Sequence, residues 1–449
     1  MPKVIFLGMI LLASMPVWPQ VTNAGADDAS RATNTEDRML TPPPVSGQAY
    51  PVALDSEEQT NLLHYGLAFS SGYNDNVLGA ATGHPVSDVN YSVWPTIGFD
   101  KTTTRVHWDL TYAPGFTFYQ RTSGRNEADQ NASISMQYRL SPHVTFSAQD
   151  TFSKSSSVFN QLNPASGPVL GGAQGPNESV IAPLADRLGN SGYVGITYQY
   201  SANDMVGGGG TFSNMHYPNT TQVPGLSDSS SQAGSAFYTH RVSRQHYVGA
   251  TYQYERLMSY PGGFDDETRT DSVFLFYTVY PTRRFSMSFF AGPQYSDSMQ
   301  PAVGSLGSPA ISLRSWAPAG GASLDWEGRL LSAALNYSHV VSGGSGLIGA
   351  VRLDNASASV RVQFSPNLTA SVAGFYANNR VLGYSVGALN GHTNSATVAL
   401  ERALGQHLVA QLGYTRLHQT YNIPLIAEAP NTNREFFSLS YSFTRPLGR

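Results

Sequence analysis

The chain lacks cysteine altogether and has few charged residues for its length of 449. Without cysteine it can form neither a disulfide nor a lipid-modified N-terminal thiol. Charged residues make up 12% of the chain, against the roughly 25% typical of soluble domains. A net charge of −4 with no basic run argues against nucleic acid as a partner. These absences favour an envelope protein whose surface partly meets something less polar than water.

Long hydrophobic runs are also missing, except at the start of the chain. Residues 1–24 carry a positive charge at Lys3, an apolar run from Val4 to Met15 and a small residue, Ala24, at their end. This pattern is typical of a secretory signal peptide, and the run is shorter than the ~20 residues of a spanning helix. We predict a signal peptide at 1–24 and a disordered, proline-rich periplasmic tail at 25–61.

From His64 onward, apolar residues alternate with small or polar ones. A membrane protein without spanning helices must be a closed barrel, because hydrocarbon offers no partner to unpaired backbone groups. The alternation predicts strands with one face in lipid and one in a wet lumen, and helical spacing does not fit it. The apolar face is formed by Leu63, Tyr65, Leu67 and Phe69, by Val106, Trp108, Leu110 and Tyr112, by Ile134, Met136 and Tyr138, and by Phe437, Leu439, Tyr441 and Phe443.

Tight-turn signals recur about every 40 residues, the kind of period that marks a repeated unit. They lie at 100–104, 141–142, 201–204, 243–245, 281–283, 327–328, 365–367 and 405–406. Eight short turns and nine longer connections join about eighteen strands, with both termini on one side. We therefore predict an all-β fold at 62–449: a single transmembrane antiparallel β-barrel with short periplasmic turns and long extracellular loops. A soluble β-sandwich is disfavoured because aromatic residues cluster near the strand ends.

Three features resemble those of a known family. They are the Pro42-Pro43-Pro44 segment, the opening strand from Tyr65 into Gly72-Tyr73-Asn74-Asp75-Asn76, and the closing strand Phe437–Phe443 followed by Arg445-Pro446-Leu447. Together with the regular hairpins, they resemble the β-barrel porins of Gram-negative envelopes, in particular the type-two β-barrel porins. The resemblance implies an outer-membrane channel, and some members of such families look like exopolysaccharide exporters. The six residues after Phe443 depart from the terminal aromatic residue that the barrel assembly machinery reads.

The predicted lumen wall is rich in hydroxyl, amide and small side chains, with sparse charges. The lumen-facing candidates are Arg105, His107, Asp109, Arg139, Glu255, Arg361 and Glu401. A wall of mixed sign favours small, neutral hydrophilic solutes such as sugars; the alternative is that these groups only solvate the wall. The segment 155–187 forms the third outward loop, which either narrows the barrel or stays exposed.

No catalytic, cofactor-binding or metal-binding residues are predicted, and we expect no enzyme. Gly383-Tyr384-Ser385-Val386-Gly387 matches a hydrolase motif that requires a strand-to-helix turn, which an all-β chain lacks. The glycine run 207–210 likewise lacks the following helix of a phosphate site. His107 with Asp109 is half a metal site at most. An exopolysaccharide conduit and, less favoured, an outer-membrane barrel enzyme remain alternatives.

The expected partners are outer-membrane lipid, the barrel assembly machinery and sugars or polysaccharide as cargo, and a homo-oligomer stays open. Asp150 bears on the last point, because it falls in phase with the lipid-facing Phe146 and Phe152. A lipid-facing charge costs up to a few kcal/mol near the bilayer midplane. Either a bulge shifts the strand phase there, or this face contacts another subunit.

Overall fold

The structure is a computed structural model of the chain, and it describes residues 60–79, 85–155, 185–219, 226–260, 265–282, 284–300, 311–344, 348–382, 390–421 and 431–447. The predicted signal peptide, nearly all of the predicted tail and most of the 155–187 loop lie outside these ranges. Within them, no helix has the length and hydropathy that crossing a bilayer would require.

Eighteen strands and one 3₁₀ turn make up the regular structure of the described residues. The strands are β1 (Thr60–Asn74), β2 (Asp88–Thr102), β3 (Val106–Tyr119), β4 (Glu127–Arg139), β5 (Val144–Ser155), β6 (Arg187–Gln199), β7 (Asp204–His216), β8 (Ser229–Arg241), β9 (His246–Ser259), β10 (Asp266–Thr282), β11 (Phe285–Gln300), β12 (Ile311–Glu327), β13 (Leu331–Gly344), β14 (Ile348–Ser365), β15 (Leu368–Val381), β16 (Asn390–Ala403), β17 (Leu408–Tyr421) and β18 (Asn431–Pro446). The 3₁₀ turn η1 (Ser123–Arg125) precedes β4.

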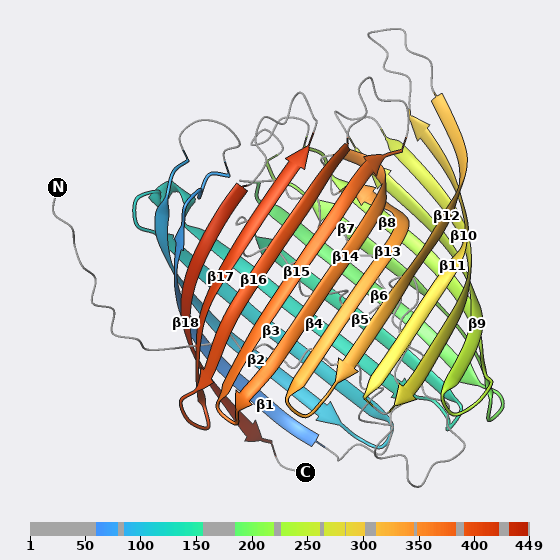
Figure 1. The fold of residues 1–449 in the computed structure, drawn as a ribbon, viewed down its shortest axis with the longest axis horizontal. Coiled ribbons are helices and arrows are strands. Elements are labelled where there is room, and N and C mark those ends of the chain that lie inside the picture. The colour runs from blue at the N-terminus through green and yellow to red at the C-terminus, as the bar shows by residue number, and fades with distance from the viewer. Residues whose placement is uncertain are drawn as a thin grey trace, which may run out of the picture.

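Each strand pairs antiparallel with its sequence neighbours, and the first and last strands close the ring. The β1–β18 ladder runs from Leu62 opposite Pro446 to Asn74 opposite Arg434, while β1 also pairs with β2 along its whole length. The strands are tilted and arranged in a closed ring (Figure 1). The predicted closed antiparallel barrel of about eighteen strands is thereby confirmed.

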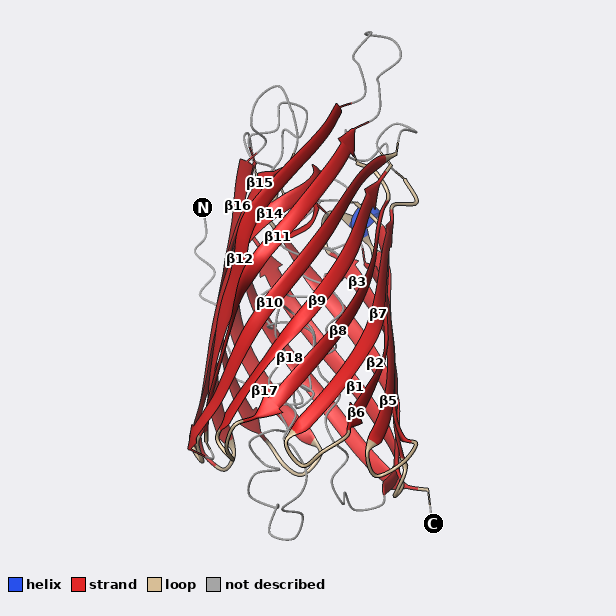
Figure 2. Ribbon diagram, turned by 90° about the vertical axis from the view of Figure 1, so that its right-hand side faces the viewer, coloured by secondary structure: helices blue, strands red, loops and turns tan. Residues whose placement is uncertain are grey.

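The two ends of the barrel differ in their connections. The eight predicted tight turns all join consecutive strands at one end, which we call the short-turn end, and β18 also ends there (Figure 2). The nine other connections lie at the opposite end, which we call the long-loop end. They range from residues 345–347 to residues 156–186.

Serine and threonine hydroxyls build five of the short turns in the same way. The hydroxyl oxygen of Thr103, Ser141, Ser201, Ser243 or Thr282 accepts a hydrogen bond from the backbone N–H two residues later. Such side chains compete with the strand ladder for backbone donors, so they end strands and start turns. The regular spacing of these residues in the sequence therefore sets the strand lengths.

Successive side chains alternate between two different surfaces. On β1, Leu67 and Phe69 are 52% and 42% exposed, whereas Ala68 and Ser70 are 4% and 3% exposed. The buried set faces inward, because members of it on distant strands touch: Met215 of β7 packs with Leu353 of β14. The outward face is thus the apolar one.

A glycine on β11 shows how closely the strands approach. A Cβ added at Gly292 would collide with the backbone carbonyl of Val273 on β10, whereas one at Gly234 of β8 meets nothing within 4 Å. We predict that Gly292→Ala lowers the free energy of unfolding by about 1–3 kcal/mol, the usual cost of overpacking. Gly234→Ala serves as the control and leaves it nearly unchanged. Urea titration of refolded protein, followed by heat-dependent gel migration, measures both; equal stability of the two variants would contradict the packing.

The lumen wall as candidate functional site

The inward face carries a series of paired hydroxyl groups. Directly opposed side chains on neighbouring strands bond across the ladder: Ser92 with Thr117 at 2.9 Å, Ser213 with Ser231 at 2.8 Å, Thr268 with Ser298 at 2.9 Å, Thr278 with Ser288 at 2.9 Å, Ser296 with Ser315 at 2.8 Å and Thr397 with Thr415 at 3.1 Å. Cross-strand hydroxyl pairs stabilise a sheet while leaving a polar surface. The inner face is therefore rich in hydroxyl groups over several strands, as its strand phase predicts, and most of these groups are buried against one another.

A second part of the inward face is apolar, which the sequence reasoning missed. Phe276, Tyr247, Phe237 and Met205 form a buried cluster on β7–β10, and Phe274 packs edge-on against Phe290 with ring centroids 5.3 Å apart. The signal was present in β10, where 273–277 reads Val-Phe-Leu-Phe-Tyr without alternation. Such a run is typical of a strand that is buried on both faces.

Glycines opposite the inward rings make room for them. The ring of Phe237 lies over Gly207, that of Phe276 over Gly249 and that of Phe290 over Gly321, so a Cβ at any of these glycines would meet the ring. The glycine run 207–210 lies in β7 and serves this packing, since Gly209 adjoins the Tyr193 ring. This part of the wall is a packed core rather than a wetted surface.

Six of the seven lumen-facing candidates lie on the inward phase of a strand: His107, Asp109, Arg139, Glu255, Arg361 and Glu401. The seventh, Arg105, is exposed in the β2–β3 turn, because the Thr103 hydroxyl bonds the N–H groups of residues 105 and 106 and ends the strand phase there. The candidates do not converge on one place. His107 is bonded to Thr102, and Glu255, whose ladder partners are Ala233 and Thr270, is almost fully buried.

Acidic residues outnumber basic ones on the inward phase of the described strands. The acidic set is Asp88, Asp100, Asp109, Glu127, Asp129, Glu255, Asp266, Asp325, Glu327 and Glu401; the basic set is Arg139, Arg187, Arg241, Arg361 and Arg434. Several of these charges act on one another, as Arg434 does on Glu127 and Arg361 on Glu401. Counted by formal charge, carboxyl groups thus outnumber guanidinium groups on this face by ten to five.

Two of these carboxylates stand directly opposite each other. Asp100 of β2 and Asp109 of β3 are cross-strand partners near the short-turn end, and their like charges repel. Directly opposed like charges destabilise an antiparallel pair. The Thr60 hydroxyl donates a hydrogen bond to Asp100, and the nearby His64 and His107 moderate the charge of Asp109.

The outward face is banded by aromatic residues. On β11 and β12, Phe285 packs near Trp326 at the short-turn end with ring centroids 6.0 Å apart, and Tyr295 packs near Trp316 towards the long-loop end at 5.1 Å. Between the two aromatic pairs, the outward positions of both strands carry no charge. On these two strands, two aromatic pairs thus bound an apolar band.

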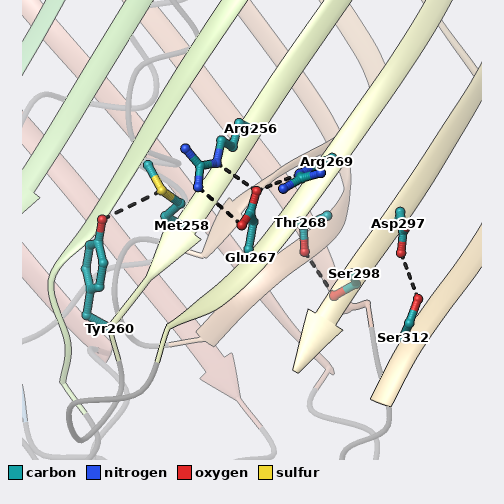
Figure 3. A network of polar contacts seen from close by, with 9 residues as sticks. All are labelled: Arg256, Met258, Tyr260, Glu267, Thr268, Arg269, Asp297, Ser298 and Ser312. Atoms are coloured by element: carbon teal, nitrogen blue, oxygen red, sulfur yellow. Dashed lines mark hydrogen bonds and ion pairs between the residues drawn. The ribbon is translucent and has the colours of Figure 1, made fainter. Parts of the chain in front are cut away.

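A polar network begins just beyond the Tyr295–Trp316 pair, on its long-loop side. Glu267 of β10 lies between the guanidinium groups of Arg256 and Arg269, at 2.7 and 2.6 Å (Figure 3). On the neighbouring strands, Asp297 accepts hydrogen bonds from Ser312 and Arg314, at 2.9 and 3.1 Å. These outward ion pairs mark the height at which the outer surface turns from apolar to charged.

Asp150 lies on the outward face in the middle of β5. The ladders on both of its sides run without a register shift, so the bulge interpretation is wrong. Its carboxylate accepts a hydrogen bond of 2.8 Å from Asn190 of β6, which is also outward. This partner lowers the cost of the charge without removing it from the apolar band.

The described residues contain no group of three or more His, Asp or Glu side chains arranged as a metal site. The hydrolase-like motif at 383–387 lies outside the described residues, as does most of the 155–187 loop with its predicted narrowing role.

Comparison with known proteins gives structural similarity only. No family model matches the chain, and no curated protein matches it by sequence. Among solved structures, the unliganded ferric citrate transporter FecA aligns with a TM-score of 0.44 at 10% identity, covering 80% of this chain and 60% of FecA. Acinetobacter baumannii OccAB4 aligns with a TM-score of 0.43 at 9% identity, over 87% of this chain and 100% of its own. Pseudomonas aeruginosa OccK2 in complex with glucuronate aligns with a TM-score of 0.43 at 10% identity, covering 85% of this chain and 98% of OccK2.

The opposed carboxylates give a stability prediction. Asp109→Asn removes the repulsion with Asp100, so we expect the free energy of unfolding at neutral pH to rise by up to about 1 kcal/mol. Asp297→Asn is the matched control, because it removes a carboxylate that is paired with Arg314 on the outer face. Urea titration should show a gain for the first variant and none for the second. A loss of stability in Asp109→Asn would show that the pair is attractive, for instance by sharing a proton.

Proposed function

We propose that the protein is an outer-membrane channel that lets small hydrophilic solutes, neutral ones foremost, cross by diffusion. The observation that carries the proposal is the division of one closed barrel into an apolar outer face and a hydroxyl-rich inner face. A soluble barrel has no use for the exposed Leu67, Ile97, Leu110, Val194 and Leu275 on one continuous surface. A lipid-facing band requires such a surface.

The height of the apolar band supports a membrane position. Phe285 and Tyr295 mark the two aromatic rings on β11, and ten residues separate them. At ~3.3 Å per residue along a strand tilted by ~40°, this separation corresponds to about 25 Å along the barrel axis. That is the height of the apolar band in outer-membrane barrels. The Arg256–Glu267–Arg269 network beyond it then lies at the level of lipid headgroups.

The orientation follows from the two ends. Bacterial barrels place short turns in the periplasm and longer loops outside the cell. We therefore assign the short-turn end, where β1 begins and β18 ends, to the periplasm. The polar network of Figure 3 then faces the outer leaflet.

The inner wall supports hydrophilic cargo and suggests a charge preference. Hydroxyl pairs such as Thr397–Thr415, which are only partly buried, offer hydrogen-bonding groups without charge, which suits neutral solutes. The excess of inward carboxylates repels small anions and attracts small cations, since charged side chains around a wide pore determine whether it favours cations or anions. This electrostatic field exerts no net force on an uncharged solute, so a preference for cations is compatible with the passage of neutral solutes.

Planar-bilayer recording of the refolded protein tests the proposal. We expect stepwise, ohmic conductance in potassium chloride, because a wetted lumen needs no gating to conduct. Liposome swelling with sugars of increasing size should show passage of small ones and a size limit. A protein that folds, as judged by heat-dependent gel migration, and yet neither conducts nor admits sugar would contradict a diffusion channel.

The inward acidic excess predicts cation preference. In a potassium chloride gradient, the reversal potential of the wild type should show potassium passing more readily than chloride. Asp100→Asn/Asp109→Asn removes two of the inward carboxylates near one mouth and should shift the potential towards zero. The control, Asp297→Asn/Asp354→Asn, removes two outward carboxylates and should leave it unchanged. Anion preference in the wild type would refute the charge assignment while leaving the channel itself intact.

A further inference from the structure

Opposite walls of the barrel touch in its long-loop half. Met215 of β7 and Tyr217, which follows β7, belong to one buried cluster with Leu353 of β14 and Phe375 of β15. We call this contact the cross-lumen bridge; its other members are Ala185, Leu226, Val351 and Ala377. Six strands, β8 to β13, lie between β7 and β14 along the shorter arc of the ring. Side chains this far apart in the sheet meet only if the barrel is pinched.

The bridge is dry. Val351, Ala377 and Ala185 are 0% exposed, and Met215 and Tyr217 are 1% and 2% exposed. Tyr217 donates its phenolic hydrogen to the Met215 sulfur, at 2.9 Å, and burial raises the pKa of this tyrosine to about 12. The Tyr217 hydroxyl therefore stays protonated in the physiological range.

Strands β12 and β13 separate towards the long-loop end, at a place that we call the seam. This separation allows the barrel to be pinched. The β12–β13 ladder ends at Gly320 opposite His339, although β12 continues to pair with β11 as far as Ile311. Beyond the seam, the N–H of Val341 donates to the side-chain oxygen of Gln294 on β11, at 3.0 Å. That bond replaces a ladder partner, so the upper part of β13 leaves the wall without an orphaned donor. It moves inward, where Val341 packs with Leu257 of β9 and Ala350 of β14.

The bridge divides the ring of strands into two unequal compartments. The smaller one is enclosed by the eight strands β7–β14, and its inner side chains form packed clusters around Leu257 and Phe274. Eight strands enclose a space that side chains just fill, so this compartment has no room for a solute. The larger one is bounded by β14–β18 and β1–β7, which is twelve strands.

The larger compartment carries most of the charged groups of the inner face. Ten of the fifteen inward charged residues on the described strands lie on β14–β18 and β1–β7. Among them, Arg434 of β18 and Glu127 of β4 attract each other, while Asp129 and Arg187 are 1% and 5% exposed. Hydroxyl pairs occur on both sides, since Thr268–Ser298 and Thr278–Ser288 lie in the smaller compartment, but the apolar clusters lie in the smaller one.

Building on the proposed channel function, we infer that the cross-lumen bridge is the size filter of the channel, so that hydrophilic solutes pass beside it along β15–β18 and β1–β6. The barrel acts there as one of about twelve strands. Since barrel diameter grows roughly linearly with strand number, the cross-section is about half that of an open ring of eighteen. Met215, Leu353 and Phe375 are the residues that set this limit.

Cross-linking tests the contact itself. The chain contains no cysteine, so a pair of introduced thiols reacts without competition. A short bifunctional thiol reagent should link Met215→Cys to Leu353→Cys in folded protein, which changes the migration of the denatured chain. The control pair, Met215→Cys with Ser438→Cys, faces across the open compartment and should remain unlinked. Absence of the first link, or equal linking of both pairs, would overturn the bridge.

Conductance tests the filter. The triple variant Met215→Ala/Leu353→Ala/Phe375→Ala should raise single-channel conductance by up to about twofold and admit larger sugars in liposome swelling. A matched triple variant, Met205→Ala/Phe237→Ala/Phe276→Ala, truncates an inward cluster on the wall of β7–β10. It should leave both readouts at wild-type values, and gel migration confirms that each variant is folded.

The outcomes separate the two proposals. A folded wild-type protein that does not conduct refutes the channel. The cross-link between Met215→Cys and Leu353→Cys then still decides whether the cross-lumen bridge exists. A conducting wild type whose conductance and sugar limit are unchanged in the Met215 triple variant refutes the filter and leaves the channel standing. An equal rise in both triple variants also refutes it, because the change would then follow from general loosening.

Discussion

The structure depends on one constraint: every backbone donor and acceptor in the wall needs a partner within the sheet. The β1–β18 ladder meets it by joining the two ends of the chain over thirteen residue pairs, so the sheet has no edge. In the proposed membrane position, hydrocarbon around the outer face makes an unpaired group costly, which ties closure to the apolar band. Where two strands separate, as β12 and β13 do beyond Gly320, a side chain accepts the hydrogen bond that the missing strand would have accepted.

Closure requires a continuous ring of strands but does not fix the shape of that ring. A wide ring of eighteen strands cannot fill its interior with side chains, yet large inward rings on β8–β11 require contact partners to be buried. Glycines on the adjacent strands, such as Gly249 beneath Phe276, let the rings lie flat against the wall. The pinch between β7 and β14 then packs one side of the interior.

Charge is distributed between the two faces with different consequences. Outward charges are paired where the apolar band ends, as Glu267 is with Arg256 and Arg269, so they mark a boundary. Inward acids exceed inward bases, and Asp100 and Asp109 even oppose each other. Proteins commonly keep a local arrangement that costs stability where it serves function. The opposed carboxylates are such an arrangement, and in the proposed channel they would contribute to the negative electrostatic potential of the lumen.

The amino-acid sequence by itself determined the barrel, its strand number and the phase of most strands, because hydroxyl-led turns and period-two alternation are local properties. Local pattern also located Asp109, Arg361 and Glu401 on the inward phase. It misplaced Arg105, whose turn depends on the Thr103 hydroxyl, and it did not reveal that Phe274 and Phe276 are inward and dry. Only the tertiary structure decided where Met215 meets Leu353. Contacts between strands seven apart depend on the curvature of the whole ring, which no local pattern encodes.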